Sequence, residues 1–221
     1  MKSYKQRCGV AKALDMVGDR WVLLIVRELL IRRGCRFTDL KNGLPGIATN
    51  LLSARLKELE AAGVIRRQHE PPPIATTLFH LTDRGLALEP AVQLLGAWGA
   101  PLLAKSRKED AVLAHWIVLP LRQHLRDHTP SGPSVSVELR SEGQPIVISA
   151  AAGTLEVHLD NAQNPQAIVK GSSLQILSLM LGKTALKAAQ SVGVQITGDL
   201  NAVRRFVPDL ASRARSQAVL P

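Results

Sequence analysis

Side chains suited to contact with a nucleic acid are concentrated between residues 36 and 69. Amide side chains such as Asn50 can pair bidentately with adenine, and hydroxyl groups can reach bases or phosphates. Lys and Arg side chains neutralise the phosphate backbone. The candidate contacts are Arg36, Thr38, Thr49, Asn50, Ser53, Arg55, Lys57, Arg66, Arg67 and His69.

A helical projection brings the central members of this set onto one surface. At 100° per residue, the segment 48–62 places Leu52, Leu56 and Leu59 on an apolar face, whereas small and polar residues occupy the opposite face. A face of this kind suits a helix that enters the major groove, which is about 12 Å wide. Arg55 lies at the edge of the apolar face, so an ion pair with Glu28 or Glu58 is an equally supported alternative. Solvation alone is the alternative for Lys57 and Arg66.

The net charge supports a polyanionic partner. The chain has 221 residues and a formal net charge of +10. Residues 1–110 contain 18 Lys and Arg against 11 Asp and Glu, a net of +7, while the remainder has a net of +3. No pattern of stacking aromatic residues favours RNA. We therefore expect the basic half to bind double-stranded DNA.

Local patterns predict the elements that position these residues. Apolar periodicity indicates two helices over 9–31, broken at Gly18-Asp19, and a short helix over 38–44. Leu44-Pro45-Gly46 predicts a turn, and a helix over 48–62 ends at Gly63. Residues 64–70 and 76–81 predict a hairpin whose tip, 71–73, is stiffened by three prolines. This order of elements is that of a winged helix-turn-helix.

The second half of the chain has a different pattern. Thr82 is expected to cap a further helix, and another helix is predicted over 110–125. Beyond Pro130 short β-rich segments predict strands at 134–140, 146–151, 154–159, 167–170 and 194–197. Helices are predicted over 174–181, over 184–191 with Thr184 as the cap, and over 201–210. The fold class is therefore expected to be α+β, with two domains.

The N-terminal half resembles the HxlR family of winged-helix regulators over roughly residues 4–103. The resemblance implies a transcriptional regulator, expected to be a repressor, that reads an inverted repeat as a homodimer paired through its N-terminal helix and the helix after the wing. The recognition helix departs from many members at Ala48-Thr49-Asn50, so the base preference is not carried over. The motifs are Cys8-Gly9-Val10, Gly18-Asp19-Arg20-Trp21, Arg36-Phe37-Thr38-Asp39-Leu40, Leu44-Pro45-Gly46-Ile47, the run 52–60, Gly63-Val64-Ile65 and Leu81-Thr82-Asp83-Arg84-Gly85.

The C-terminal half resembles the sterol carrier protein 2 fold over about residues 108–215. The carrying segments are 168–177, 181–183 and 194–206. The resemblance implies helices on a mostly antiparallel sheet and a module that binds an apolar small molecule or lipid, with domains at 1–105 and 106–221. The expected ligand wall is Leu174, Leu177, Leu181 and Val194, and ordinary core packing of these residues is the favoured alternative.

The two cysteines are too few for a disulfide scaffold, and no Cys/His cluster has zinc-ligand spacing. Cys8 occupies the position of a reactive thiol in several HxlR-like regulators, so the resemblance suggests a redox sensor beside Lys5, Arg7 and Lys12. The alternative is an inert packing residue. Cys35 is the weaker candidate for a sensor. We expect no metal and no cofactor.

Other classes of protein have less support. The six histidines are scattered, and no nucleophile, acid pair or phosphate-binding loop indicates an enzyme. The absence of a signal segment or long apolar run predicts a cytoplasmic protein without a membrane span. The competing hypothesis is a lipid-binding or lipid-transfer protein whose winged helix is a protein-interaction adaptor.

Overall fold

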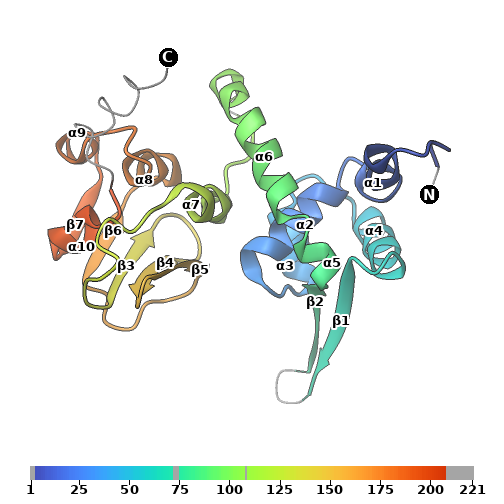
Figure 1. Cartoon of the computed structure of the whole chain (residues 1–221), viewed down its shortest axis with the longest axis horizontal. Coiled ribbons are helices and arrows are strands. Elements are labelled where there is room, and N and C mark those ends of the chain that lie inside the picture. The colour runs from blue at the N-terminus through green and yellow to red at the C-terminus, as the bar shows by residue number, and fades with distance from the viewer. Residues whose placement is uncertain (1–2, 72–74, 108, 208–221) are drawn as a thin grey trace. The chain divides into compact units, whose positions relative to one another are not determined.

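The computed structural model describes residues 3–71, 75–107 and 109–207 (Figure 1). The chain divides into two compact units, Met1–Ala111 and Val112–Pro221. The first unit is helical with one hairpin, and the second contains a five-stranded sheet with helices. The α+β class expected from the sequence is confirmed.

Four helices open the first unit, close to their predicted positions. The short third helix and the longer fourth helix are separated by the turn at Pro45-Gly46. Gly63 follows the fourth helix with φ +67°, the left-handed conformation that lets a glycine end a helix. The helices are α1 (Gly9–Val17), α2 (Val22–Arg32), α3 (Phe37–Gly43) and α4 (Thr49–Ala61).

The predicted hairpin is present as β1 (Ile65–Glu70) and β2 (Thr76–Leu81), which pair antiparallel. We call this hairpin the wing. Its base is joined to the α2–α3 loop, because the backbones of Cys35 and Phe79 exchange hydrogen bonds of 3.1 and 2.8 Å. The predicted stiffening by Pro72 and Pro73 lies outside the described residues.

Three short helical segments follow the wing: α5 (Asp83–Leu86), α6 (Glu89–Gly99) and the 3₁₀ helix η1 (Ala100–Lys105). The Thr82 hydroxyl caps α5, as predicted, by accepting the Gly85 N–H at 3.2 Å. No residue of α6 is buried within the chain.

The stretch Asp83–Lys105 is long and apolar enough to cross a membrane by length and composition. The sequence expectation of no membrane span rested on the absence of a long uninterrupted apolar run. Arg84, Glu89 and Gln93 interrupt this stretch, so that criterion did not identify it. One or two such helices are weak evidence for a membrane protein.

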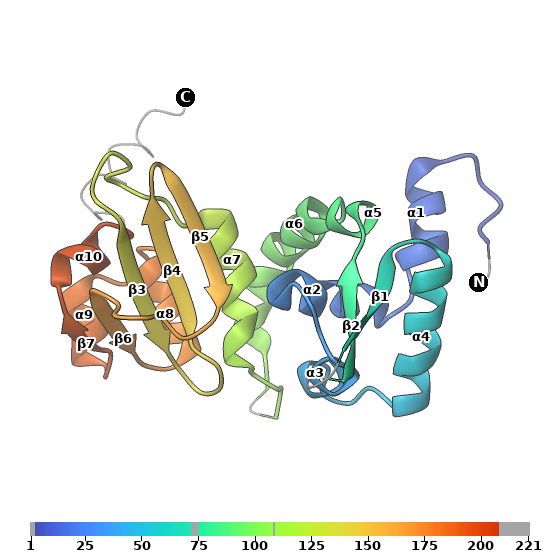
Figure 2. The same cartoon turned by 90° about the horizontal axis from the view of Figure 1, so that it is seen from below.

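The second unit is built on a sheet of strand order β5-β4-β3-β6-β7. Strands β3 and β6 are parallel and the other neighbours are antiparallel, so the sheet is mostly antiparallel, as expected. Figure 2 shows α8 behind β3, β4 and β6. The strands are β3 (Val135–Arg140), β4 (Ile146–Ala151), β5 (Thr154–Leu159), β6 (Ala167–Lys170) and β7 (Gln195–Gly198).

In the second unit, three helix ends lie at other residues than predicted. The helix predicted from 110 begins as a 3₁₀ turn, η2, only at Ala114, and Thr184 bonds the Ser178 hydroxyl at 2.7 Å instead of capping α9. The helix predicted to 210 ends at Arg204, and residues 208–210 lie outside the described part. The elements are η2 (Ala114–Ile117), α7 (Val118–His124), α8 (Ser173–Met180), α9 (Leu186–Ser191) and α10 (Leu200–Arg204).

Candidate nucleic-acid interface

Helix α4 has the two faces that its periodicity predicts. Leu52, Leu56 and Leu59 are buried in the first unit. Thr49, Asn50 and Lys57 are exposed, and Ser53 is half-buried. The exposed face carries short side chains near its start, so the helix backbone can closely approach a groove.

The first turn of α4 is open to a ligand. Ala48 precedes the helix and provides no side-chain cap, and the first turn contains no acidic residue. The first N–H groups of a helix have no intrahelical partner and form the positive end of its dipole, so they attract phosphate oxygens. The Asn50 Oδ1 atom accepts the Leu51 N–H at 2.9 Å, which orients the carboxamide next to this turn.

Helix α3 and the following turn are tied to the start of α4. The Lys41 ammonium donates a hydrogen bond to the Ile47 carbonyl oxygen. At the other end of α3, the Arg36 N–H donates to Asp39 Oδ2 at 2.9 Å. Arg36 and Thr38 are exposed, and within the described part of the chain the Arg36 guanidinium has no ion-pair partner.

The wing presents three exposed cationic or titratable side chains, Arg66, Arg67 and His69. Arg66 donates to Gln68 Oε1 at 2.8 Å, and His69 Nδ1 lies 3.0 Å from the Thr77 hydroxyl. Arg67 pairs with Glu60 of α4 at 2.8 Å and stacks over the Phe79 ring at 5.6 Å. Arg67 thus links the wing to α4, and a phosphate contact would compete with this ion pair.

Arg55 is engaged by two carboxylates. Its guanidinium lies 2.6 Å from Asp19 Oδ2 and also pairs with Glu58. The hydrogen bond with Glu58 and the charge of Asp19 raise the pKa of Arg55. Of the two partners considered from the sequence, Glu58 is used and Glu28 is committed elsewhere. The ion-pair role of Arg55 therefore has direct structural support.

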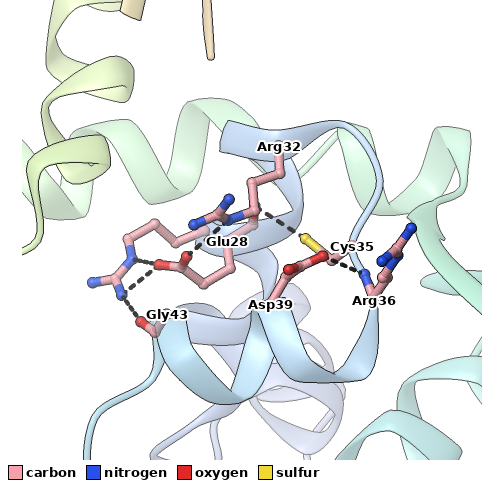
Figure 3. A network of polar contacts seen from close by, with 7 residues as sticks. Glu28, Arg32, Cys35, Arg36, Asp39 and Gly43 are labelled. Carbon is pink, nitrogen blue, oxygen red and sulfur yellow. Dashed lines mark hydrogen bonds and ion pairs between the residues drawn. The ribbon is translucent and has the colours of Figure 1, made fainter. Parts of the chain in front are cut away.

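Glu28 holds the helix-turn-helix together through a polar network that sequence reasoning missed. Its carboxylate is fully buried on α2 and binds Arg27 at 2.8 and 3.0 Å, with Arg32 at 3.8 Å (Figure 3). Arg27 also donates to the Gly43 carbonyl oxygen at 3.3 Å. A Cβ atom on Gly43 would lie 2.2 Å from the Glu28 carboxylate. The network thus fixes α3 against α2, and the only sequence signal was a Glu in a run of apolar helix residues.

The two thiols have opposite environments. Cys8 is exposed at the start of α1, where the backbone N–H groups of Ala11 and Val10 lower the pKa of its thiol. Cys35 is buried beneath the wing, and burial raises the pKa of its thiol to about 12. A lowered pKa favours the nucleophilic thiolate, whereas a raised pKa keeps a thiol inert at neutral pH.

The four residues expected to form a ligand wall lie in different settings. Leu181 and Val194 are buried, Leu177 is half-buried and Leu174 is exposed at the start of α8. A pocket of about 520 Å³ opens there, and Leu174 is the one member of the four that lines it. The other three occupy packing positions in the second unit.

The fold and the exposed face define a class of protein. A helix-turn-helix formed by α3 and α4, followed by a basic wing, is the architecture of a DNA-binding transcriptional regulator. Residues 16–107 match the model of the HxlR-like helix-turn-helix family, and residues 130–210 match the SCP-2 sterol transfer family.

Relatives in sequence give the same result. The chain is 40% identical over 87 residues to the Bacillus subtilis "Uncharacterized HTH-type transcriptional regulator YvaP", covering 39% of this chain and 80% of that protein. It is 34% identical over 86 residues to the B. subtilis "HTH-type transcriptional regulator YodB", covering 39% and 76%. A solved structure of reduced YodB is 29% identical and covers 46% of this chain and all of that one, with a TM-score of 0.40. The chain belongs to the HxlR-like helix-turn-helix family.

Proposed function

We propose that this protein is a non-enzymatic transcriptional repressor that reads an inverted-repeat operator as a homodimer. The observation that carries the proposal is the open first turn of α4, with Thr49 and Asn50 exposed and the Arg66 side chain on the following hairpin. Base choice would come from Thr49, Asn50 and Ser53, whereas Arg36 and the wing would bind phosphates.

An apolar surface supports the homodimer. Trp98 is 75% exposed, and Val10 and Leu14 of α1 are exposed as well. Large apolar side chains exposed together on a helix favour a protein partner. A second copy suits it, because a twofold pair of α4 helices reads two half-sites of an inverted repeat. The surface on α6 and η1 contains Leu94, Leu95, Trp98, Leu102 and Leu103.

Two inputs to DNA binding are part of the proposal. The C-terminal unit would respond to an apolar small molecule, which the match to the SCP-2 family supports. The Cys8 thiol would respond to electrophiles or oxidants, which its exposure and lowered pKa support. Solved relatives include a structure titled "Redox regulator HypR in its oxidized form", at 30% identity and a TM-score of 0.40.

The decisive experiment recovers genomic DNA fragments bound by the purified full-length protein and measures their affinity by fluorescence anisotropy at physiological salt. We expect an inverted repeat bound by a dimer. Trp98→Glu should yield monomers in analytical ultracentrifugation and weaken operator binding by at least about a hundredfold, since half of the contacts are lost. Val192→Glu, at an apolar side chain that is 59% exposed in the second unit, is the matched control.

One result would overturn the proposal, and another would overturn only its dimer interface. If the wild-type protein enriches no fragment and retards none, while it still binds lipid, the lipid-binding alternative replaces it. If Trp98→Glu remains a dimer with unchanged operator affinity, the α6 surface is not the dimer interface.

A further inference from the structure

His80 of β2 makes a side-chain contact with the end of helix α2. Its Nδ1 atom lies 2.9 Å from the Arg33 carbonyl oxygen. Because a carbonyl oxygen can only accept, Nδ1 carries the proton and donates it, which fixes the tautomer of the neutral ring. The contact lies beside the backbone pair of Cys35 and Phe79, where the base of the wing meets the α2–α3 loop (Figure 1). We call the contact between His80 and Arg33 the latch.

The backbone of the loop is adapted to the imidazole ring. Arg33 has φ +58°, a left-handed conformation that is unfavourable for any residue with a side chain. Gly34 would adopt this conformation freely, but it serves a close approach instead. A Cβ atom on Gly34 would lie 2.7 Å from Cε1 of His80. The ring therefore fills the space beside the glycine, and its hydrogen bond holds the carbonyl group of the strained residue.

The second nitrogen of the ring has no partner. Nε2 of His80 is shielded from solvent and makes no hydrogen bond with the described residues. Nearly all buried polar groups are hydrogen-bonded, so such an atom calls for an explanation. In the neutral tautomer Nε2 has only a lone pair, which costs less to leave unpaired than a charged donor. A proton on Nε2 would create a buried cationic N–H group without an acceptor.

The charges closest in register would oppose such a proton. Arg66 of β1 is the register partner of His80, so the two side chains lie on the same face of the wing. Like charges at directly opposite positions of an antiparallel pair are destabilising. Arg33, which accepts the hydrogen bond through its carbonyl group, is a second cationic residue at this junction.

No carboxylate pairs with the ring within the described part of the chain. The elements packed against β2 are α2, α3, α5 and β1. Glu28 of α2 binds Arg27 and Arg32, and Asp39 of α3 accepts the Arg36 N–H. Glu70, at the far end of β1, accepts from Gln68. The other titratable or charged residues are Cys35 of the loop, Lys41 of α3, Asp83 and Arg84 of α5, and Arg67 and His69 on the opposite face of β1.

We propose that His80 is a positioning residue for DNA binding, whose neutral ring holds the wing against the α2–α3 loop and whose protonation on Nε2 releases it. Without the latch, the wing and its Arg66 are less often in the orientation that meets phosphates. The affinity for DNA falls with the fraction of molecules that have the wing in place. Histidine changes its charge between about pH 5 and pH 8, so DNA binding weakens as the pH falls through this range. This inference rests on the proposed function and adds a means of regulation to it.

Hydrogen exchange of the free full-length protein tests the latch without DNA. The amides of Cys35 and Phe79 report it, because they form the adjacent backbone pair. At pH 8, His80→Ala should speed their exchange by about tenfold, as expected for the loss of one buried hydrogen bond. His80→Asn should exchange like the wild type, because the Asn amide places a donor where Nδ1 lies.

The same measurement at pH 5.5 tests the release. After correction for the intrinsic exchange rate, the wild type should lose the protection of both amides. His80→Asn should keep it, because an amide does not take up a proton in this range. His124→Asn, which removes an exposed histidine from the second unit, is the matched control and should respond like the wild type.

Fluorescence anisotropy with the operator then measures the effect on DNA binding. At pH 8, His80→Ala should bind about tenfold more weakly than the wild type, and His80→Asn should bind equally well. From pH 8 to pH 5.5, the wild type should lose about tenfold more affinity than His80→Asn. Both proteins retain His69, so the protonation of that wing residue cancels in the comparison. A merely structural role of His80 would not produce this difference.

Each part of the proposal can be overturned separately. An equal acid response of the wild type and His80→Asn would overturn the release by protonation. Exchange in His80→Asn as fast as in His80→Ala at pH 8 would overturn the Nδ1 donor as the holding group. Unchanged operator affinity in His80→Ala would overturn the positioning role. If the wild type binds no DNA, the proposed function fails, whereas the exchange data still decide the latch because they are recorded without DNA.

Discussion

Helix α4 and the wing face solvent with different chemistry. The outward face of α4 carries the exposed Thr49 and Asn50 and the half-buried Ser53, and Lys57 is its single free cation among the described residues. The wing carries Arg66, Arg67 and His69 on one strand. Amide and hydroxyl groups discriminate bases, whereas arginines bind phosphates in any sequence. Specificity and affinity are therefore expected to lie on separate elements.

The two elements share one scaffold. Arg67 pairs with Glu60 of α4, and the wing base is bonded to the loop before α3 through Cys35 and Phe79. The Glu28 network holds α3 in turn. A change in the scaffold should affect both elements, whereas a change at the surface should affect one.

Gly43→Ala should have the largest effect, because the new methyl group would lie 2.2 Å from the Glu28 carboxylate. Overpacking of this kind costs about 3 kcal/mol at its upper range. We expect a lower unfolding temperature for the first unit and loss of DNA binding for every sequence, measured by calorimetry and anisotropy. Gly9→Ala, where a Cβ meets nothing within 4 Å, is the control. Wild-type stability in Gly43→Ala would contradict the tight α2–α3 contact.

Asn50→Ala should remove base discrimination. Loss of a bidentate contact costs about 2 kcal/mol for the preferred base pair and little for others. Anisotropy against operators with single base changes measures this loss, and the salt dependence should remain that of the wild type. Asn42→Ala, at an exposed amide on α3, provides the matched control. Equal weakening on all sequences would move Asn50 from base reading to phosphate binding.

Arg66→Ala should weaken binding uniformly and reduce the salt slope by about one. Arg67→Ala should do the same if Arg67 exchanges Glu60 for a phosphate, and an unchanged slope would assign it to wing packing. Arg204→Ala removes an exposed arginine from the second unit and serves as the control. A change in base preference in Arg66→Ala would contradict the separation of roles.

The two cysteines should differ in their rates of alkylation. Of the changes considered, alkylation should have the smallest effect on DNA binding. The lowered pKa of Cys8 gives more thiolate at pH 7.5 than an ordinary thiol, so its reaction with iodoacetamide should be fast and should level off as pH exceeds its pKa. Cys35, with a pKa of about 12, should stay unmodified from pH 7 to 9 until the protein is denatured. Peptide mass spectrometry measures both rates, and Cys8→Ser identifies the fast site.

Diamide treatment then tests the proposed response of DNA binding to oxidation of the Cys8 thiol. We expect altered DNA affinity in the wild type and none in Cys8→Ser. Unaltered affinity of the treated wild-type protein would reject Cys8 as a sensor.

Local patterns were sufficient for α1 to α4 and the wing, whereas the single helix predicted after Thr82 is divided into α5, α6 and η1. Apolar spacing in α4, Pro45-Gly46 before it and Gly63 after it each act within a few residues, so they can be recognised without a fold. Thr184 shows the limit of such patterns. It has the chemistry of a cap, but the Ser178 hydroxyl binds it in the folded chain.

The amino-acid sequence by itself determined the winged helix-turn-helix, the side chains available on its exposed helix face and the resemblance of its second half to a lipid-carrier fold. Only the tertiary structure decided that Arg55 pairs with Asp19, that Gly43 lies against Glu28, and that His80 binds the Arg33 carbonyl oxygen. The reason is that periodicity, capping and turn chemistry are local, whereas ion pairs and hydrogen bonds between elements depend on residues far apart in the chain.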